Sequence, residues 1–451
     1  MAVQRPATAG ERLGALIQIP TVSAFYPTEG TDSFRRLAEQ LEVNWPLTHQ
    51  HLEREWVGEI GLLYRWPGRA SDRPLVLMAH GDVVPADQAD GWDYDPFLGA
   101  VRDGWVLGRG ALDDKGALAS IMEAVESLLE SGFEPEQDIY LAFGGDEERF
   151  GDTASTMAAL LADRGIHPFL VLDEGGAVVD APLPGISVPL AVIGVAEKGI
   201  TSLRLSTDGP AGHASAPTPA SATRRLVRAL ERIERRPVFP GNVPEIGHGL
   251  LRSVAPHAAR PLSFVYRHSK FFAPILRRAF DKAGGEAAAL LRTTVALTVL
   301  RAGDANNVIP ALASAVLNLR IAPGMSVDEA VAAIRRRIND PAVRIEILEA
   351  DEPSPISPSG FDGEPEDVAA WQLLSDAVAA GYPDAVTAPY LMVAASDARH
   401  YHRHFPRVYR FAPLRMQAEQ LRSIHGLNEA VSESSLESAR EVYAALIRGV
   451  R

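Results

Sequence analysis

The strongest constraint on the fold is an alternation of short β-rich runs with helical patterns from about residue 10 to residue 196. The run at 74–79 (PLVLMA) is apolar on both faces, as buried strands are, and residues 116–129 repeat their apolar positions at helical spacing. The further elements that we expect in this part are strands at 139–143 and 169–172 and a helix at 152–163. The alternation predicts an α/β fold with a mostly parallel central sheet flanked by helices.

The pattern changes at about residue 199. The expected elements there are strands at 201–206, 294–300 and 315–321 and helices at 222–235 and 326–338. This order predicts a smaller α+β sandwich inserted into the main fold. Residues 237–267 are rich in Pro, Gly and His and are interpreted as an irregular stretch where substrate specificity would lie.

Segment 351–367 is dense in Pro and Ser and is expected to be the linker back to the main fold, followed by a helix over 368–380. We therefore expect three ranges: 1–198 as the first part of the main domain, 199–352 as the inserted domain, and 353–451 as the second part of the main domain.

Composition excludes several classes of protein. The net charge is -14, which disfavours a nucleic-acid partner. The chain has no Cys, so any metal ion must be held by His and carboxylate side chains. No apolar run approaches the ~20 residues of a membrane helix, and the first residues carry no export signal. We expect no membrane partner and a cytoplasmic location.

Polar clusters follow the expected strands, where α/β sheets bind their ligands. His80 and Asp82 lie two positions apart on an extended segment, so Asp82 can fix the tautomer of His80 while the other ring nitrogen binds a metal ion. Taken alone, this pair is more often a capped surface histidine. The GRGALDDKG segment adds Asp113 and Asp114 before a helix, where an aspartate is often only an N-cap.

Carboxylates also end the next two strands. The run Asp146–Glu148 concentrates negative charge that bound cations would offset, although a lone acidic run is more often a solvated turn. Asp173 and Glu174 end another strand, and His425 lies near the C-terminus. Together these residues form a nitrogen and oxygen ligand set suited to a pair of zinc-like ions.

The order of these motifs resembles that of the di-zinc aminoacylase and carboxypeptidase family, which includes acetylornithine deacetylase, succinyl-diaminopimelate desuccinylase, aminoacylase and glutamate carboxypeptidase. The motifs are HGDVVP, GRGALDDKG, GGDEE, LDEGG, EKG, GHAS, NNVIP and HGLNE, and they cover nearly the whole chain. AFGGDEE, LDEGG and VAEKG are most similar to the carboxypeptidase S and N-acyl-amino-acid hydrolase branch. The resemblance implies a zinc-exopeptidase-like catalytic domain with an inserted lid or dimerisation domain.

The resemblance also implies a set of metal ligands. These are His80 and Glu174 for one zinc ion, Glu148 and His425 for the other, and Asp113 as the bridge between them. Asp173 remains an alternative to Glu174, and Asp114 is interpreted as a helix-start residue. Two His with oxygen ligands also accept cobalt or manganese.

Three catalytic roles follow from the same resemblance. Asp82 would support His80, and Glu147 would be the general base, since neighbouring Glu147 and Glu148 cannot both bind one ion comfortably. His213 of the GHAS motif would stabilise the oxyanion, and in dimeric relatives this residue reaches the partner's site. Without the resemblance, His213 would be an ordinary turn residue.

Candidate substrate contacts are Asn307, Arg320 and Arg399. Substrates of the family end in a free carboxylate, which a guanidinium group fits well. Because only four of the 44 basic residues are Lys, a lone Arg is weak evidence. Asp397 lies where relatives carry a Gly-x-Thr-Asp segment, and the alternating histidines at 400, 402 and 404 are interpreted as surface or supporting residues.

The sequence thus predicts a metal-dependent hydrolase that cleaves an amide bond next to a free carboxylate, in a peptide or an N-acyl amino acid. The partners expected are a small-molecule or short-peptide substrate and a second copy of the chain through the inserted domain. A non-catalytic binding relative and a two-metal phosphoesterase are the alternatives, and the preferred side chain or acyl group cannot be read from the sequence.

Overall fold

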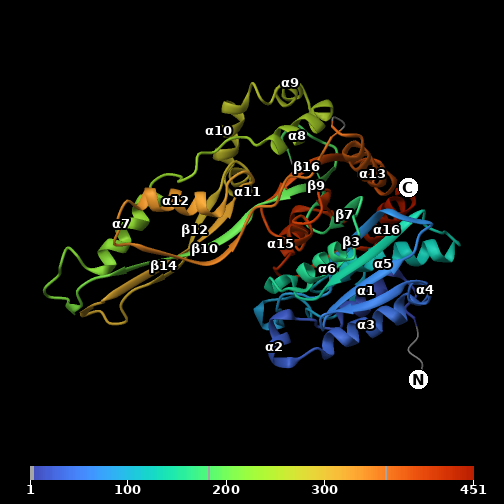
Figure 1. The fold of residues 1–451 in the computed structure, drawn as a ribbon, viewed down its shortest axis with the longest axis horizontal. Coiled ribbons are helices and arrows are strands. Elements are labelled where there is room, and N and C mark those ends of the chain that lie inside the picture. The colour runs from blue at the N-terminus through green and yellow to red at the C-terminus, as the bar shows by residue number, and fades with distance from the viewer. Residues whose placement is uncertain (1–4, 181–182, 361–362) are drawn as a thin grey trace.

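The computed structural model describes residues 5–180, 183–360 and 363–451. A compact α/β part contains the first and the last described residues, and an elongated part extends away from it (Figure 1). Phe361 and Asp362 of the expected linker lie outside the described residues. Among the described residues, none of the helices is long and apolar enough to cross a membrane.

A ten-stranded mixed sheet forms the centre of the α/β part. Its strands in spatial order are β1 (Glu53–Val57), β2 (Gly61–Trp66), β6 (Gln137–Gly144), β3 (Ala70–His80), β7 (Leu170–Asp173), β17 (Val408–Arg410), β9 (Leu190–Glu197), β8 (Ala177–Val179) and β18 (Arg415–Met416), with β16 (Val386–Met392) also paired to β9. The four central strands β6, β3, β7 and β17 run parallel, whereas β1 and β2 are antiparallel to their neighbours. The predicted parallel centre of the sheet is confirmed, and antiparallel pairs lie on both sides of it, because β9 is antiparallel to β17 and to β8.

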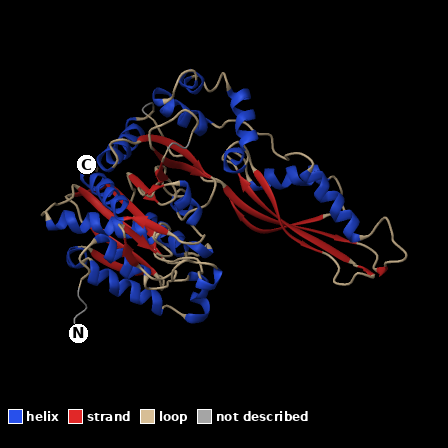
Figure 2. Cartoon of the chain, turned by 180° about the vertical axis from the view of Figure 1, so that it is seen from behind, coloured by secondary structure: helices blue, strands red, loops and turns tan. Residues whose placement is uncertain are grey.

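Helices cover both faces of this sheet (Figure 2). Strand β3 shows why: Leu75 and Leu77 belong to the core cluster shared with α5, while Val76 and Met78 belong to the cluster shared with α6. Successive residues of a strand point to opposite faces, so a continuous apolar run requires cover on both. The first face carries α1 (Ala9–Ile17), α5 (Lys115–Glu130), α13 (Pro365–Gly381) and α16 (Glu433–Gly449), and the second carries α6 (Thr153–Asp163) and α14 (Ala398–Tyr401).

The remaining elements of the α/β part lie outside the central sheet, and some of them, such as α3, also contribute side chains to its core. They are α2 (Tyr26–Glu29), α3 (Asp32–Asn44), α4 (Pro46–His51), α15 (Ala418–Ser423), the short 3-10 helices at Ser23–Phe25 and Gln88–Asp90, and a small sheet of β19 (Ala430–Ser432), β5 (Trp105–Leu107) and β4 (Ala100–Arg102). Strand β19 lies five residues after His425 and so holds the C-terminal motif against the first half of the chain.

The elongated part contains a four-stranded antiparallel sheet, which we call the lid sheet. Its spatial order is β12 (Thr294–Arg301), β14 (Leu312–Ile321), β10 (Gly199–Asp208) and β15 (Arg344–Asp351). Helices α7 (Ala222–Glu234) and α12 (Val327–Ile338) pack on one face of the sheet through a separate apolar cluster. Every second residue of β14 is buried, as expected for a sheet covered on one face only.

The segment predicted as an irregular stretch at 237–267 contains helices, so that prediction is wrong. The helices of this region are α8 (Glu245–Val254), a 3-10 turn at Ala255–His257, α9 (Leu262–Arg267), α10 (Ala273–Ala283) and α11 (Gly285–Ala289). They share an apolar cluster with Ile186, Leu190 and Val386 of the α/β part and not with the lid sheet. Their Pro and Gly residues lie mostly at helix ends, which masked the helical pattern.

The two parts of the molecule meet at a narrow neck. Strand β9 ends at Glu197 and β10 begins at Gly199, directly opposite the end of β15. A side chain at Gly199 would collide with the carbonyl oxygen of Asp351 at 2.5 Å, so the crossing strands approach as closely as only glycine permits. The buried Lys198 donates hydrogen bonds to the carbonyl oxygens of Ala289 and Arg292, both at 2.6 Å.

Candidate metal centre

The parallel strands bring the predicted polar clusters to one edge of the sheet. Strand β3 ends at His80, β6 ends just before the 3-10 turn Glu147–Arg149, and β7 ends at Asp173. Strand β3 pairs in parallel with both β6 and β7, so these three carboxyl ends lie side by side. The register pairs His80 directly with Gly144.

Asp113 lies between the two predicted histidine ligands. His80 Nε2 is 3.0 Å from Asp113 Oδ1, and His425 Nε2 is 3.1 Å from Asp113 Oδ2. His425 Nε2 is also 2.9 Å from Glu148 Oε2. His80, Asp113 and Glu148 each offer one ligand atom, and these atoms lie within 4.8 Å of one another. Each carboxylate oxygen of Asp113 thus faces a different histidine, which is the arrangement that a bridging ligand needs.

Asp82 contacts both His80 and the acidic turn that carries Glu148. His80 Nδ1 is 3.3 Å from Asp82 Oδ1 and 3.1 Å from the carbonyl oxygen of Asp82, so its other ring nitrogen points to Asp113. The fully buried Asp82 carboxylate also accepts the backbone N–H groups of Glu147 and Glu148, at 3.2 and 3.1 Å. One carboxylate therefore orients both a histidine and the acidic turn of the next strand.

The predicted general base lies in a crowded, negatively charged environment. Glu147 is 8% exposed. Burial raises the pKa of Glu147 well above its usual range, and the negative charges of Asp397, Asp113 and Glu148 raise it further against the opposing effect of His80. A positive charge placed among these carboxylates would lower the pKa of Glu147 again.

Charged residues of the same cluster shift the pKa values of Glu174 and Asp173, although neither residue is in the group of close ligand atoms formed by His80, Asp113 and Glu148. Burial raises the pKa of Glu174 well above its usual range, followed by the charges of Asp113, Asp114 and Glu147. Burial also raises the pKa of Asp173, to about 6, whereas hydrogen bonds from backbone N–H groups of Glu174 and Ala398 lower it. Among the described residues, however, Asp173 Oδ2 is buried without a hydrogen-bond partner, so these surroundings leave both carboxylates as candidates for the ligand.

The residues around Asp113 include two whose contacts the sequence did not predict. Asp114 is the N-cap residue of α5, as its interpretation as a helix-start residue predicts, but its side chain makes no capping hydrogen bond. It is fully buried, and its Oδ2 accepts the backbone N–H of His80 at 3.2 Å. Glu429, missed from the sequence although it ends the HGLNE motif, accepts the backbone N–H of Asp113 at 3.1 Å and pairs with Arg109.

The donor set fits divalent metal ions. Burial lowers the pKa of His80, but hydrogen bonds to Asp113 and Asp82 outweigh this effect and raise it well above the usual value. Hydrogen bonds to Asp113 and Glu148 raise the pKa of His425 to about 10. These shifts show that the surrounding carboxylates favour positive charge at this place, which a bound cation would supply.

The predicted lid residues lie far from this cluster. His213 is in β11 (Gly212–His213), which pairs with β13 (Val308–Ile309) beyond the last pair of the β10–β14 ladder. The backbone N–H of Ala214 donates to the carbonyl oxygen of Asn307 at 3.0 Å, so His213 and Asn307 are neighbours, and both are exposed. The ladder pairs every residue from Gly199 to Asp208, which places them ~30 Å from the neck. This small ribbon forms the far end of the lid (Figure 2).

The two candidate arginines lie near the neck. Arg320, on β14, is the register partner of Ile200 on β10. Burial lowers the pKa of Arg320. The guanidinium group of Arg399 already has partners within the protein. Its Nε lies 2.9 Å from Asp351 Oδ2, and its Nη1 donates to the carbonyl oxygen of Ser396 at 2.6 Å. Arg399 thus ties the end of β15 to the α/β part, whereas none of the described residues forms an ion pair with Arg320.

The three alternating histidines have different environments. His404 is exposed and fits the surface interpretation, but His402 is buried against Arg410, with its Nε2 3.3 Å from Ser357 Oγ. Arg410 pairs with Glu197 at 3.3 Å, and the same carboxylate accepts the backbone N–H and the hydroxyl of Ser396. This network holds the loop before the buried Asp397, and the EKG motif is the sequence signal that contains Glu197.

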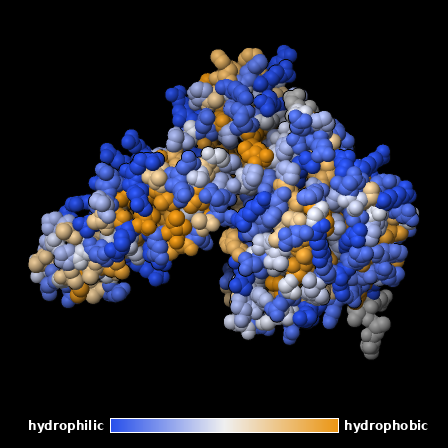
Figure 3. All heavy atoms as spheres, in the orientation of Figure 1, coloured by the Kyte–Doolittle hydropathy of each residue, from blue (hydrophilic) through white to orange (hydrophobic). Residues whose placement is uncertain are grey.

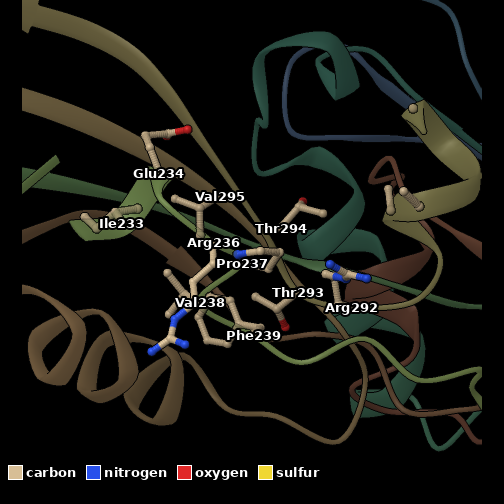
Figure 4. A pocket seen from close by; sticks show the side chains of 13 residues that line it. Ile233, Glu234, Arg236, Pro237, Val238, Phe239, Arg292, Thr293, Thr294 and Val295 are labelled. Carbon is tan, nitrogen blue, oxygen red and sulfur yellow. The ribbon is translucent and has the colours of Figure 1, made fainter. Parts of the chain in front are cut away.

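A cavity of about 310 Å³ lies between α7, α11 and β12 (Figure 4). Its lining includes Pro237, Val238 and Phe239, which belong to the stretch predicted to set specificity, together with Arg292 and Thr293. None of the candidate site residues lines it. The cavity is therefore separate from the metal centre.

Comparison with known proteins shows the family of the chain. Residues 76–449 match peptidase family M20/M25/M40, and this range contains every candidate site residue. The chain belongs to this family. It is therefore a member of a family of hydrolytic enzymes that includes metallopeptidases. The predicted resemblance is confirmed.

Relatives of the M20 protein cover nearly its whole length. It is 33% identical over 447 residues to the human "N-fatty-acyl-amino acid synthase/hydrolase PM20D1", covering 97% of this chain and 87% of the relative. It is 34% identical over 420 residues to "Probable carboxypeptidase S-like 2" of Dictyostelium discoideum, covering 92% and 79%. The structure of an M20 family metallo-carboxypeptidase from Sulfolobus solfataricus, Sso-CP2, shares the fold, with a TM-score of 0.70 and 17% identity over 97% of both chains.

Proposed function

We propose that this M20 protein hydrolyses an amide bond next to a free carboxylate, with two divalent metal ions held by His80, Asp113, Glu148, Glu174 and His425. Zinc is the metal we propose, and cobalt or manganese suit the same ligands. The observation that carries the proposal is the position of Asp113, which presents one carboxylate oxygen to each of two histidines. In this proposal residues 1–198 and 353–451 form the catalytic domain and residues 199–352 the inserted domain.

The protein's own groups divide the work of the reaction. Bound metal ions supply positive charge that polarises the amide carbonyl and lowers the pKa of water. Glu147 takes a proton from the attacking water at its carboxylate and passes it to the leaving amine. Asp82 keeps the Nε2 atom of His80 directed at the centre. His213 donates a hydrogen bond to the oxygen that becomes negatively charged.

The substrate class that we favour is an N-acyl amino acid, with a C-terminal peptide bond as the second candidate. The relative named as an N-fatty-acyl-amino acid synthase/hydrolase matches over 97% of this chain, and the carboxypeptidase S-like relative supports the alternative. Both substrates present a carboxylate next to the scissile amide. Arg320, without an ion-pair partner among the described residues, suits this carboxylate better than Arg399, which Asp351 already occupies.

The position of His213 favours action on a partner subunit. His213 lies ~30 Å along the lid sheet from the neck and is exposed, so a second copy of the chain docked through residues 199–352 would receive it in its own catalytic centre. Asn307, next to His213, would reach the same substrate. We include this homodimer in the proposal.

The test is hydrolysis of a panel of N-acyl amino acids and dipeptides, together with analysis of bound metal. We expect activity to be lost on chelation and restored by zinc, with two metal ions per chain. The panel's acyl chains run from acetyl to long fatty acyl, so that the preferred length is measured directly. Two bound ions with turnover of phosphate esters only would contradict the amide assignment, and full activity after complete metal removal would contradict the metal mechanism.

A further inference from the structure

A second exposed feature lies in the helices between the lid sheet and the α/β part. We call residues 252–282, which include α9 and α10, the helical tip. Three of its apolar side chains are largely exposed: Phe264 at 60%, Phe271 at 81% and Ile275 at 60%. Figure 3 shows pale orange atoms at the top of the molecule, over α9, next to blue atoms. Exposed apolar side chains that gather at a protruding point usually mark a contact surface.

The exposed aromatic rings pack against one another on a fixed base. The ring centroids of Phe271 and Phe272 are 5.1 Å apart, and those of Phe264 and Phe272 are 5.9 Å apart. Beneath them, Tyr266 is buried and its hydroxyl donates to the carbonyl oxygen of Pro184 at 2.8 Å. Leu276 is buried in the same apolar cluster as Leu190. The tip is therefore a rigid apolar projection and not a loosely packed loop.

The charge of the helical tip is opposite to that of the rest of the chain. Residues 252–282 contain seven Lys and Arg and a single acidic residue, a net charge of +6, while the whole chain carries -14. Lys270 pairs with Glu245 at 2.9 Å, and Asp281 pairs with Arg292. Across the part of the chain that the structure describes, the other six basic residues of the tip form no ion pair: Arg252, Arg260, Arg267, Arg277, Arg278 and Lys282.

The basic and apolar residues alternate on the same exposed faces. On α10, Ile275 is followed three residues later by Arg278 and seven residues later by Lys282, and all three are exposed. On α9, Phe264 is followed three residues later by the exposed Arg267. Residues three, four and seven apart lie on one side of a helix, so each exposed apolar side chain has a cation within one or two turns.

We propose that the helical tip docks onto an anionic lipid surface. Apolar side chains that enter the interface, flanked by cations that meet anionic headgroups, are the two components of peripheral membrane binding. A flat membrane suits a convex projection, whereas a protein partner usually requires a complementary groove. The expectation of no membrane partner rested on the absence of a spanning segment, and a peripheral contact needs none. The proposal is independent of the proposed hydrolysis.

The test is co-flotation of the full-length, metal-loaded protein with lipid vesicles. One set is phosphatidylcholine alone, and the other contains phosphatidylcholine with phosphatidylglycerol. We expect binding to the anionic vesicles that weakens as salt is added, and a loss of about tenfold or more in the double variant Phe271→Glu with Ile275→Glu. Both side chains are exposed, so the variant should fold normally, which unchanged thermal unfolding would verify.

A matched control places the same charges elsewhere. Val227 and Ile356 are 55% and 54% exposed and lie outside the helical tip, so the variant Val227→Glu with Ile356→Glu should bind as the wild type does. Arg267→Gln, Arg278→Gln and Lys282→Gln together should remove most of the preference for anionic vesicles. Absence of wild-type binding, equal loss in the control, or concentration-dependent self-association that only the tip variant abolishes would each overturn the proposal.

Discussion

The metal centre and the far end of the lid present their functional side chains in opposite ways. In the centre, the carboxylates are buried and held by several backbone N–H groups, as Asp82 is by the N–H groups of Glu147 and Glu148. At the lid end, His213 is exposed on a two-residue strand and contacts mainly its own turn through Ser215. The centre is thus preorganised within one chain, whereas the role proposed for His213 requires that another surface approach it.

The largest effect is expected inside the centre. Glu147→Gln keeps the size of the side chain and removes its basicity, so we expect kcat to fall by about 10²–10⁴-fold with bound metal unchanged. Steady-state kinetics with metal analysis measures both quantities. His80→Ala is the contrasting variant, and it should lose metal as well as turnover. A Glu147→Gln enzyme with near-normal kcat would show that another group is the base.

At the lid end, His213→Ala should lower kcat by about 10²–10³-fold, while metal content stays at the wild-type level. Mixing this variant with Glu147→Gln tests the partner role directly. In a mixed dimer, the His213→Ala chain keeps its own Glu147 and receives an intact His213, so one of the two sites is complete. About half of the dimers in an equal mixture are mixed, so we expect about a quarter of wild-type activity to return. An inactive mixture of confirmed dimers would contradict action across the interface.

Substitution of Asp82, which orients His80, should have a smaller effect than substitution of the proposed catalytic residues. Asp82→Asn keeps the shape but weakens the hold on His80 and on the acidic turn, so we expect metal affinity to fall by about 10–100-fold. Competition with a chromogenic chelator measures this change. Asp87→Asn is an exposed control from the following loop and should leave the affinity unchanged.

The smallest expected effect is on the stability of the fold and concerns His402. Burial, together with the charge of Arg410, lowers the pKa of His402 to about 3 from an ordinary value of 6.5. As the pH falls below 6.5, the unfolded chain binds a proton at this residue that the folded chain does not, so stability falls toward pH 3. We expect a contribution of about 2 kcal/mol between pH 6.5 and pH 5.

Urea unfolding at both pH values measures this contribution. His402→Gln should flatten the pH dependence, while His404→Gln, at an exposed position two residues away, should leave it unchanged. An identical pH slope in wild type and His402→Gln would contradict the assignment.

The fold and the centre differ in how far the sequence predicts them. The strands and helices around 74–172 were predicted closely, because apolar runs with two covered faces leave few alternatives. The same strand ends predicted the positions of His80, Glu148 and Asp173. The helices at 245–289 were missed, since their Pro and Gly residues at helix ends obscure a short amphipathic pattern.

Supporting residues were harder to predict than candidate ligands. Glu429 acts by accepting backbone N–H groups from a segment more than 300 residues away, and no local pattern reports such a contact. Asp114 looked like an ordinary helix cap, and only the fold shows that it accepts the N–H of His80. The ion pair of Arg399 with Asp351 likewise depends on how the inserted segment returns. The metal and catalytic roles of the candidate residues themselves stay predictions.

Strands β10 and β15 approach each other closely at Gly199, at the base of the lid sheet. A small rotation at this base moves the far end of the sheet by a large distance. A rotation of about 10° at this point would displace the far end of a ~30 Å ladder by about 5 Å. Because Gly199 packs against the Asp351 carbonyl, a methyl group at this position would push strands β10 and β15 apart at the base of the lid sheet. A change of a few tenths of an ångström at Gly199 would therefore be magnified many times where His213 lies. If His213 acts as we propose, its reach would depend on a glycine at the other end of the lid sheet.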